Sequence, residues 1–216
     1  MRRGLFITLE GIEGAGKTTV ARFICTELER AAVAVRPTRE PGGTPLAERV
    51  RQIVLERSAE PLSAVTETLL MFAARALHVA NLITPALERG EWVVCDRFTD
   101  ATRAYQGSGR GVDGALIEAL AHAVHPQLAP DCTLLLDLPV AVGLSRAHTR
   151  RPGTAPADRF ETETLEFFER VRAGYRALAR AEPRRFRIID AAAPLARVEE
   201  QIAAVVAELR ARAAHS

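Results

Sequence analysis

A glycine-rich segment near the start of the chain has the residue types and spacing of a phosphate-binding loop. The pattern G-x-x-x-x-G-K-[ST] is met in full by Gly11, Ile12, Glu13, Gly14, Ala15, Gly16, Lys17 and Thr18, and Thr19 follows. Glycines let backbone N–H groups wrap a β-phosphate, and the positive end of a following helix points at the same anion. Lys17 suits the β- and γ-phosphates, and the Thr18 hydroxyl suits Mg²⁺. The segment predicts a nucleoside triphosphate site, which kinases, switches, motors and synthetases share.

An acid and a base follow the apolar run at residues 93–95. If this run is a strand, Asp96 stands at its carboxyl end, where it can hold a Mg²⁺-bound water, and Arg97 faces the phosphates. GTPase switches typically place Asp-x-x-Gly here, and this segment has no such motif. The pair favours a kinase, while a solvated Asp–Arg pair at a strand end is the alternative.

Two further groups of arginines are candidates for phosphate binding. Arg39 lies in residues 38–44, which follow an expected strand and so fall beside the phosphate loop; a plain turn is the alternative. The second group surrounds a piece rich in glycine and proline within residues 146–160, and its members are Arg146, Arg150, Arg151 and Arg159. Mobile guanidiniums can neutralise charge that develops during phosphoryl transfer. We expect this segment to be a lid, with an arginine-rich exposed face as the alternative.

These residues need a scaffold that brings them together, and the hydrophobic pattern predicts one. Short apolar runs predict strands at residues 5–9, 33–35, 92–95, 132–136 and 186–189. Helical spacing predicts helices at residues 17–31, 45–55, 64–88, 114–124, 140–148, 162–181 and 195–213. Strands that alternate with helices predict an α/β fold with a five-stranded parallel sheet flanked by helices on both faces. With the phosphate loop, this is the P-loop NTPase fold, in a single domain over residues 1–216.

Composition narrows the classes of partner and location. The formal net charge of +2 is too small to argue for nucleic-acid or membrane binding. Three cysteines without CxxC spacing argue against a disulfide framework or a zinc site. The N-terminus shows no signal-peptide pattern, and no apolar run approaches the roughly 20 residues that cross a bilayer. We therefore expect a cytoplasmic protein that binds neither nucleic acid nor membrane.

Taken in order, six segments resemble the thymidylate kinase family over nearly the whole chain. They are residues 6–19, 38–44 (TREPGGT), 70–75 (LMFAAR), 96–97, 104–111 (AYQGSGRG) and 158–161 (DRFE). The ordered set is specific, although no single member is. The chain looks like the bacterial type of this family, in which the phosphate loop lacks an arginine and the lid supplies the catalytic ones. Glu13 and Ala15 stand where the other type has its loop arginine.

The resemblance implies a pocket for the base and sugar of dTMP. Phe72 would stack on the thymine ring, and Arg75 would hydrogen-bond its exocyclic oxygen. Spacing alone places both on one helix face, and core packing is the alternative for Phe72. Thr102 and Gln106 would face the base edge, and Tyr105 would lie below the sugar.

The resemblance also implies how the phosphates, the metal and the donor ATP are held. Arg39 and Arg97 would hold the dTMP phosphate, and Glu13 would bind the 3′-hydroxyl. The residues implied around Mg²⁺ are Thr18, Asp96 and Glu10, with Glu161 nearby. ATP would lie on the phosphate loop and Arg146, with its adenine beside residues 190–194. Either Arg150 or Arg151 would be the catalytic lid arginine, and the resemblance leaves the choice between them open.

The implied reaction transfers the γ-phosphoryl group of ATP to dTMP, giving dTDP and ADP for dTTP biosynthesis. Lys17, Thr18 with Mg²⁺, Arg97 and a lid arginine would position the phosphates and neutralise their charge. One alternative is a kinase for another nucleoside monophosphate or for a deoxynucleoside, which would need a base such as Glu40 or Asp96. A nucleotide-dependent switch is the alternative from another class.

The family is usually homodimeric, which the resemblance carries over to this chain. The apolar helix faces near residues 64–87 and 116–124 would supply the interface, unless they belong to the core.

Overall fold

The computed structural model describes residues 3–56, 60–149, 159–160 and 163–215. Arg150 and Arg151, the two candidates for the catalytic lid arginine, lie outside the described residues. The same holds for Asp158 and Glu161. Both ends of the expected lid are described, at residues 146–149 and 159–160.

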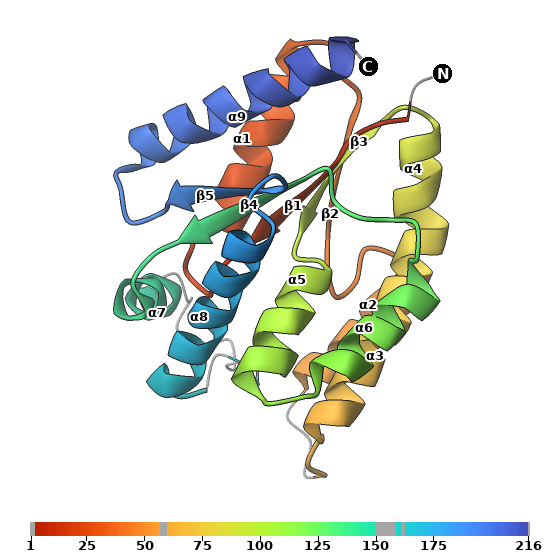
Figure 1. Cartoon of the computed structure of the whole chain (residues 1–216), viewed down its shortest axis with the longest axis vertical. Helices are drawn as coiled ribbons and strands as arrows, with labels where there is room; N and C mark the ends of the chain where they lie inside the picture. The colour runs from red at the N-terminus through yellow and green to blue at the C-terminus, as the bar shows by residue number, and fades with distance from the viewer. Residues whose placement is uncertain (1–2, 57–59, 150–158, 161–162, 216) are drawn as a thin grey trace.

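In the described part of the chain, five parallel strands form the centre of the molecule, as the apolar runs predict (Figure 1). They are β1 (Phe6–Glu10), β2 (Val35–Arg39), β3 (Trp92–Asp96), β4 (Cys132–Asp137) and β5 (Phe186–Asp190). Their order is β2-β3-β1-β4-β5, so β2 and β3 lie on one side of β1 and β4 and β5 lie on the other. Such a reversal opens a crevice at the carboxyl ends of the strands, and the phosphate loop leaves β1 there.

Backbone hydrogen bonds continue past the strand ends and fix the first residues of the loops. Asp96 pairs with Leu9 on one side and with Arg39 on the other. Beyond these pairs, the Arg97 N–H donates to the Leu9 carbonyl and the Glu40 N–H donates to the Asp96 carbonyl, both at 2.9 Å. The ladder therefore carries four ionisable residues, Arg39, Glu40, Asp96 and Arg97, to the end of the strands from which the phosphate loop departs.

Helices cover both faces of the sheet, as predicted (Figure 1). On one face, α1 (Lys17–Arg30) lies beside α9 (Leu195–His215). The other face carries α8 (Leu165–Ala181), which packs against α5 (Thr99–Thr102) and the π-helix η2 (Arg103–Gly109). A third group contains α2 (Pro45–Leu55), α3 (Ala64–His78) and α6 (Gly114–Val124). The remaining elements are η1 (Val79–Ile83) and α4 (Thr84–Glu88), which continue α3, and α7 (Val140–Thr149), which follows β4.

The second strand differs from the prediction. It was expected at residues 33–35, whereas β2 spans Val35–Arg39 and includes Arg36, Pro37 and Thr38. This strand lies at the edge of the sheet, where polar residues and proline are tolerated because one side of the backbone is unpaired. Arg39 therefore ends the strand, and residues 38–44 overlap it where they were expected to follow it.

Residues 99–109 form a helical segment that the sequence pattern does not predict. Its glycines argue against a helix on propensity, but close packing against α8 favours them. A Cβ on Gly109 would lie 2.6 Å from the Phe167 ring, which leaves no room for a side chain. The helix α8 itself begins at Leu165, three residues after the expected start, because the Thr164 hydroxyl caps it by accepting the Phe167 N–H at 3.2 Å.

The phosphate loop touches α7 through backbone atoms. A Cβ on Gly14 would collide with the Gly143 carbonyl group, and a Cβ on Gly143 would lie 2.7 Å from the Glu13 carbonyl oxygen. Gly14 also has a φ of 73°, in the left-handed region that glycine adopts without strain. The loop therefore rests on the helix that leads into residues 150–158.

One helical stretch passes a length and composition test for crossing a membrane, contrary to the expectation that no segment comes near that length. It runs from Ala64 to Glu88, with a mean hydropathy of 1.3 in its most apolar window. Glu67, Arg75 and His78 lie on it and are at most 1% exposed. All three have partners of opposite or ionisable character within the chain, so one face of this stretch belongs to the packed core.

The contact between η2 and α8 gives a stability prediction. In Gly174→Ala, the new Cβ would lie 2.7 Å from the Ser108 Cβ, and one of the two helices must shift. Overpacking costs about 1–3 kcal/mol and outweighs the gain of about 1 kcal/mol from replacing a helical glycine. We expect the free energy of unfolding in urea to fall by about 1–2 kcal/mol.

Gly114→Ala is the matched control, because nothing lies within 4 Å of its Cβ position at the start of α6. Its unfolding free energy should stay the same or rise by up to about 1 kcal/mol. Equal effects of the two substitutions would contradict the packing argument.

Candidate active site

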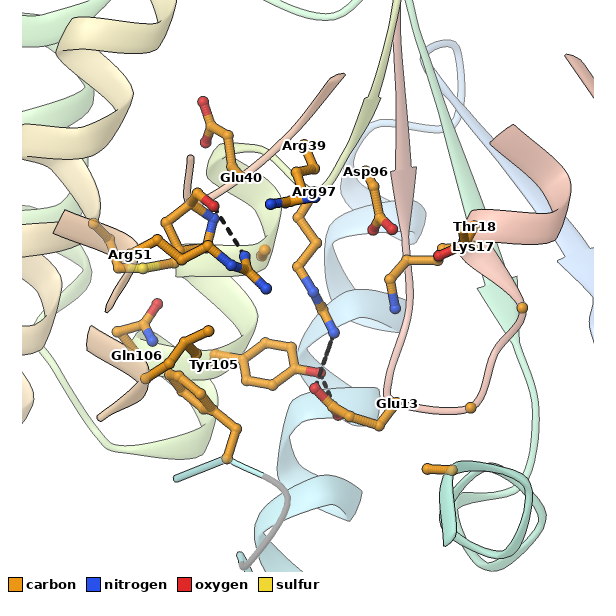
Figure 2. Close-up of a pocket in the computed structure, with 18 residues that line it drawn as sticks. Glu13, Lys17, Thr18, Arg39, Glu40, Arg51, Asp96, Arg97, Tyr105 and Gln106 are labelled. Atoms are coloured by element: carbon orange, nitrogen blue, oxygen red, sulfur yellow. Dashed lines mark hydrogen bonds and ion pairs between the residues drawn. The ribbon is translucent and has the colours of Figure 1, made fainter. Parts of the chain in front are cut away.

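A cavity of about 610 Å³ opens at the carboxyl ends of the strands, between the phosphate loop and the helical group of α2, α3 and η2. Figure 2 shows side chains from both sides pointing into it. Ten of the predicted site residues line the cavity: Glu13, Gly14, Gly16, Lys17, Thr18, Arg39, Asp96, Arg97, Tyr105 and Gln106. Predicted residues that do not line it are Glu10, Gly11, Ile12, Ala15, Thr19, Phe72, Arg75, Thr102 and Arg146.

The phosphate loop has the geometry of an anion cradle. Gly16 precedes α1 in the left-handed conformation, with a φ of 91°, and the helix N-terminus faces the cavity. The Lys17 ammonium folds back over the loop and donates to the carbonyl oxygens of Gly11 at 3.1 Å and Ile12 at 3.0 Å. Burial lowers the pKa of Lys17 to about 8, helped by the nearby positive charge of Arg97.

Two predicted metal ligands meet beside this lysine. Figure 2 shows the Asp96 carboxylate pointing toward Lys17 and Thr18, and both Asp96 and Thr18 line the cavity. A carboxylate and a hydroxyl are oxygen donors of the kind that Mg²⁺ prefers, with phosphate oxygens and water as its other ligands. No cluster of three or more His, Cys, Asp or Glu side chains able to hold a metal occurs among the described residues. The site therefore fits a metal that arrives with a nucleotide.

Glu10, the third predicted metal ligand, lies beneath the cavity. Its two carboxylate oxygens accept hydrogen bonds from the Tyr175 hydroxyl at 2.7 Å and the Phe98 N–H at 2.8 Å. Burial raises the pKa of Glu10 to about 8, with a further contribution from the negative charge of Asp100. The structure does not bring this carboxylate to the cavity.

A network of four side chains connects the two halves of the cavity. The Arg97 guanidinium donates to the Glu13 carboxylate, the Tyr105 hydroxyl and the Gly11 carbonyl, each at 3.0 Å, and to the Tyr175 hydroxyl at 3.2 Å. The Tyr105 hydroxyl also donates to Glu13 at 2.7 Å. Arg97 has a φ of 73°, in the left-handed region. This backbone conformation turns its side chain over the phosphate loop, a direction that a continued strand would not give. The network holds a cation, a carboxylate and an aromatic ring within one wall (Figure 2).

Arg75, which is 1% exposed, lies behind the wall of the cavity opposite the phosphate loop. Its guanidinium donates to Glu40 at 2.7 Å and to the Thr102 hydroxyl at 3.1 Å, and its Cζ lies 4.7 Å from the centre of the Phe72 ring. Burial opposes ionisation of Glu40, but Arg75 and His78 hold its pKa below its usual value. The sequence predicted the Arg75–Thr102 neighbourhood but not this buried ion pair.

Two buried polar atoms on this wall have no hydrogen-bond partner among the described residues. They are Nη1 of Arg75, a donor, and Oε1 of Gln106, an acceptor. Buried polar atoms are usually paired, so an unpaired donor and acceptor beside a cavity indicate a polar ligand. Phe72 packs in a core cluster with Val112 and Ile117 and does not line the cavity, whereas Met71 does.

The other nucleotide residues expected from the sequence lie beside α7. The Arg146 guanidinium donates to the Ala191 carbonyl at 2.6 Å and to the Ala192 carbonyl at 3.5 Å, so it packs on the turn after β5. This turn contains residues 190–194, which were expected beside the adenine. Arg146 and the turn are thus together, outside the cavity lining.

Comparison with known proteins agrees with this geometry. A family model described as thymidylate kinase matches residues 9–202. The thymidylate kinase of Pseudomonas syringae pv. syringae (strain B728a) is 57% identical over 196 residues, which cover 91% of each chain. This chain belongs to the thymidylate kinase family. The corresponding protein of Pseudomonas savastanoi pv. phaseolicola (strain 1448A / Race 6) is 53% identical over 206 residues, which cover 95% of this chain and 96% of that protein.

The fold agrees as well. The crystal structure of thymidylate kinase from Ehrlichia chaffeensis superposes with a TM-score of 0.75 at 32% identity, covering 94% of this chain and 99% of that one. The predicted family and the predicted P-loop NTPase fold are therefore confirmed.

Arg51, which the sequence did not single out, also lines the cavity, and it does so from α2. Its guanidinium donates to the Pro41 carbonyl at 2.9 Å, as Figure 2 shows. A signal was available, since Glu48, Arg51 and Leu55 share one face of the predicted helix at residues 45–55. Glu48 accepts two hydrogen bonds from Arg39, at 3.1 and 3.0 Å, so this helix face adjoins the expected phosphate site.

The lowered pKa of Lys17 gives a pH prediction for ATP binding. Below pH 8 the ammonium is charged and attracts the phosphates, whereas above pH 8 it becomes neutral in the free protein. We expect the dissociation constant for Mg-ATP, measured by calorimetry, to rise about fivefold from pH 8 to pH 9, because half of the ammonium groups are already neutral at pH 8.

Lys17→Arg is the control, because a guanidinium stays charged over this range. Its binding should be weaker near pH 7 but flat up to pH 9. The same pH slope in both proteins would show that Lys17 is not the titrating group.

Proposed function

We propose that this chain transfers the γ-phosphoryl group of ATP to the 5′-phosphate of dTMP, giving dTDP and ADP in dTTP biosynthesis. The observation that carries the proposal is the pairing, around one cavity, of a phosphate cradle with a buried, unsatisfied donor and acceptor. The cradle accounts for the triphosphate. The unsatisfied donor and acceptor account for the base of the second substrate.

The polarity of these two atoms matches the thymine edge. The Arg75 guanidinium can only donate and suits the exocyclic oxygen O4, and the free Gln106 oxygen suits the N3–H. Met71 and Ala101 contribute apolar surface to the same part of the cavity. Thr102 orients the guanidinium through their hydrogen bond. The Phe72 ring packs against the Arg75 guanidinium. It would contact the base only if the side chains between it and the cavity changed position.

The sugar and phosphate of dTMP fit the central network. Glu13 offers a carboxylate to the 3′-hydroxyl, and the Tyr105 ring supports the sugar from one side. Arg39, Arg51 and Arg97 line the cavity together and bring three guanidiniums to the acceptor phosphate. Guanidiniums bind phosphate oxygens in planar pairs, which fixes the direction of the attacking oxygen.

Catalysis in this site is positioning and charge neutralisation. A 5′-phosphate oxygen of dTMP attacks the γ-phosphorus in line, and the bond from that phosphorus to the β–γ bridging oxygen breaks. The acceptor is already an oxyanion at neutral pH, so no general base is required. Lys17 and Arg97 hold the negative charge that develops on the oxygens. Thr18 and Asp96 would hold Mg²⁺, which neutralises phosphate charge when it is bound.

The expected lid at residues 146–160 would supply the last catalytic group. We assign the remaining catalytic charge to Arg150 or Arg151, which the sequence supplies between α7 and residue 159. Arg146, on the last turn of α7, adjoins the ATP side through its contacts with the turn after β5. Closure of such a segment excludes water and limits transfer of the phosphoryl group to water.

The assembly we propose is a homodimer, formed through α2 and α3. Leu46 and Ile53 on α2 and Val65 and Leu69 on α3 are each about half exposed, so these packed helices present apolar surface outward. We also propose a cytoplasmic location without nucleic-acid or membrane partners. The net charge of +2 and the packed, internally paired helix over Ala64–Glu88 support this assignment.

The reaction is tested by measuring ADP formation from Mg-ATP with each nucleoside monophosphate offered separately at equal concentration. We expect strong activity with dTMP, weaker activity with dUMP and little with the others, because only thymine and uracil present the matching O4 and N3–H. Activity confined to another acceptor would leave the phosphate site intact and contradict the base assignment. ATP loss that is indifferent to every acceptor would indicate the switch class instead.

Removal of the cradle charge gives a second test. In Lys17→Ala we expect kcat for dTMP phosphorylation to fall at least about 10²–10³-fold, the typical cost of losing one donor to a developing oxyanion. The circular dichroism spectrum and thermal midpoint should stay near those of the parent protein, because Lys17 is only partly buried and belongs to no core cluster. Near-normal turnover in a folded variant would contradict the mechanism.

A further inference from the structure

A buried carboxylate behind the base pocket has no role in the chemistry described so far. Glu67, on α3, is completely buried. Its carboxylate accepts hydrogen bonds from Nε2 of Gln106 at 2.6 Å, from Nε of Arg110 at 2.9 Å and from Nη2 of Arg159. The two guanidiniums balance the charge that burial would otherwise make costly.

This contact decides which end of the Gln106 amide faces the cavity. An amide has a donor end and an acceptor end, and the two can exchange by a half-turn. A carboxylate only accepts, so Nε2 must face Glu67. The oxygen Oε1 is then turned away, and it is the buried acceptor without a partner. Because Gln106 lines the cavity, that acceptor is available to the substrate.

We propose that Glu67 is a positioning residue that sets the hydrogen-bond polarity of the base pocket, so that the pocket accepts pyrimidines with an N3–H and rejects cytosine. This inference rests on the proposed function, since it assigns the selectivity of the same pocket. Thymine and uracil carry a hydrogen on N3, which Oε1 of Gln106 accepts. Cytosine has a bare N3, and two acceptors would face each other in a site that excludes water.

The two oxygens of the Glu67 carboxylate have different partners. Oε1 accepts from both Gln106 and Arg110, and Oε2 accepts from Arg159. In Glu67→Gln, the new carbonyl oxygen can stay at the Oε1 position and keep two donors, so the Gln106 amide keeps its direction. In Glu67→Met, no acceptor faces Gln106, so its amide is free to reverse and to present its donor end to the cavity. The pocket should then suit the N3 of cytosine.

Three variants separate polarity from structural support. Glu67→Met keeps the length of the side chain and removes the acceptor that faces Gln106. Glu67→Gln removes the charge and keeps an acceptor for Gln106. Glu163→Gln is the matched control, because Glu163 also pairs with Arg110, at 2.8 Å, but makes no contact with Gln106 in the described structure. The measurement is kcat and KM for dTMP and for dCMP with each protein.

We expect Glu67→Met to raise KM for dTMP and to lower it for dCMP, so that the ratio of their kcat/KM values falls about tenfold or more. The kcat for dTMP should change by less than about threefold, since the phosphate residues are untouched. Glu67→Gln should keep most of the preference for dTMP, although its thermal midpoint falls. Glu163→Gln should keep the parent ratio.

An unchanged ratio in Glu67→Met, or a larger loss of preference in Glu67→Gln than in Glu67→Met, would overturn the inference. If Glu67→Met does not fold, Gln106→Met decides, because it removes both ends of the amide and leaves Glu67 with its arginines. A parent-like preference in Gln106→Met would also overturn it. Failure of the parent protein to phosphorylate dTMP would instead contradict the proposed function.

Discussion

The guanidinium of Arg97 is the point at which separate parts of the chain meet. It follows β3, donates to the carbonyl of Gly11 in the phosphate loop and reaches Glu13, Tyr105 on η2 and Tyr175 on α8. A left-handed backbone at this arginine aims the side chain at the loop. One cation thus ties the loop, two helices and a strand end together, and the rest of the site takes its geometry from this tie.

Buried charge is the second constraint on the molecule. The long helix over Ala64–Glu88 resembles a membrane span in composition, yet Glu67 and Arg75 are buried on it with opposite charges as partners. Desolvation makes an unpaired buried charge costly, so the helix is stable only where Glu40, Arg110 and Arg159 surround it. The packing of α3 and the shape of the base pocket are therefore consequences of the same ion pairs.

The sequence predicted the architecture well, because buried strands and amphipathic helices leave a period that survives in one dimension. Asp96 and Arg97 line the cavity as expected, since Asp96 ends such a strand and Arg97 follows it, and Lys17 does so because it begins the helix after the glycine-rich loop. Contacts between buried residues that are far apart in the sequence produce no such period. Nothing near Glu10 indicates that Tyr175 and the Phe98 N–H take up its carboxylate, and nothing near Glu67 indicates its contact with Gln106. Arg51 belongs to none of the recognised motifs, and only its position on one helix face with Glu48 indicated its place.

The hydrophobic pattern also failed to indicate the full length of β2, because arginine, proline and threonine occupy most of this strand. Those residues have a consequence for the solution behaviour of the protein. An edge strand offers unpaired N–H and C=O groups to any passing chain, and a long apolar edge seeds aggregates. Pro37 removes one donor from this edge, and Arg36 and Arg39 add charge on either side of it. The border of the sheet therefore resists growth by strand addition, and the features that hide it from hydrophobic pattern recognition are those that keep the sheet at its finite width.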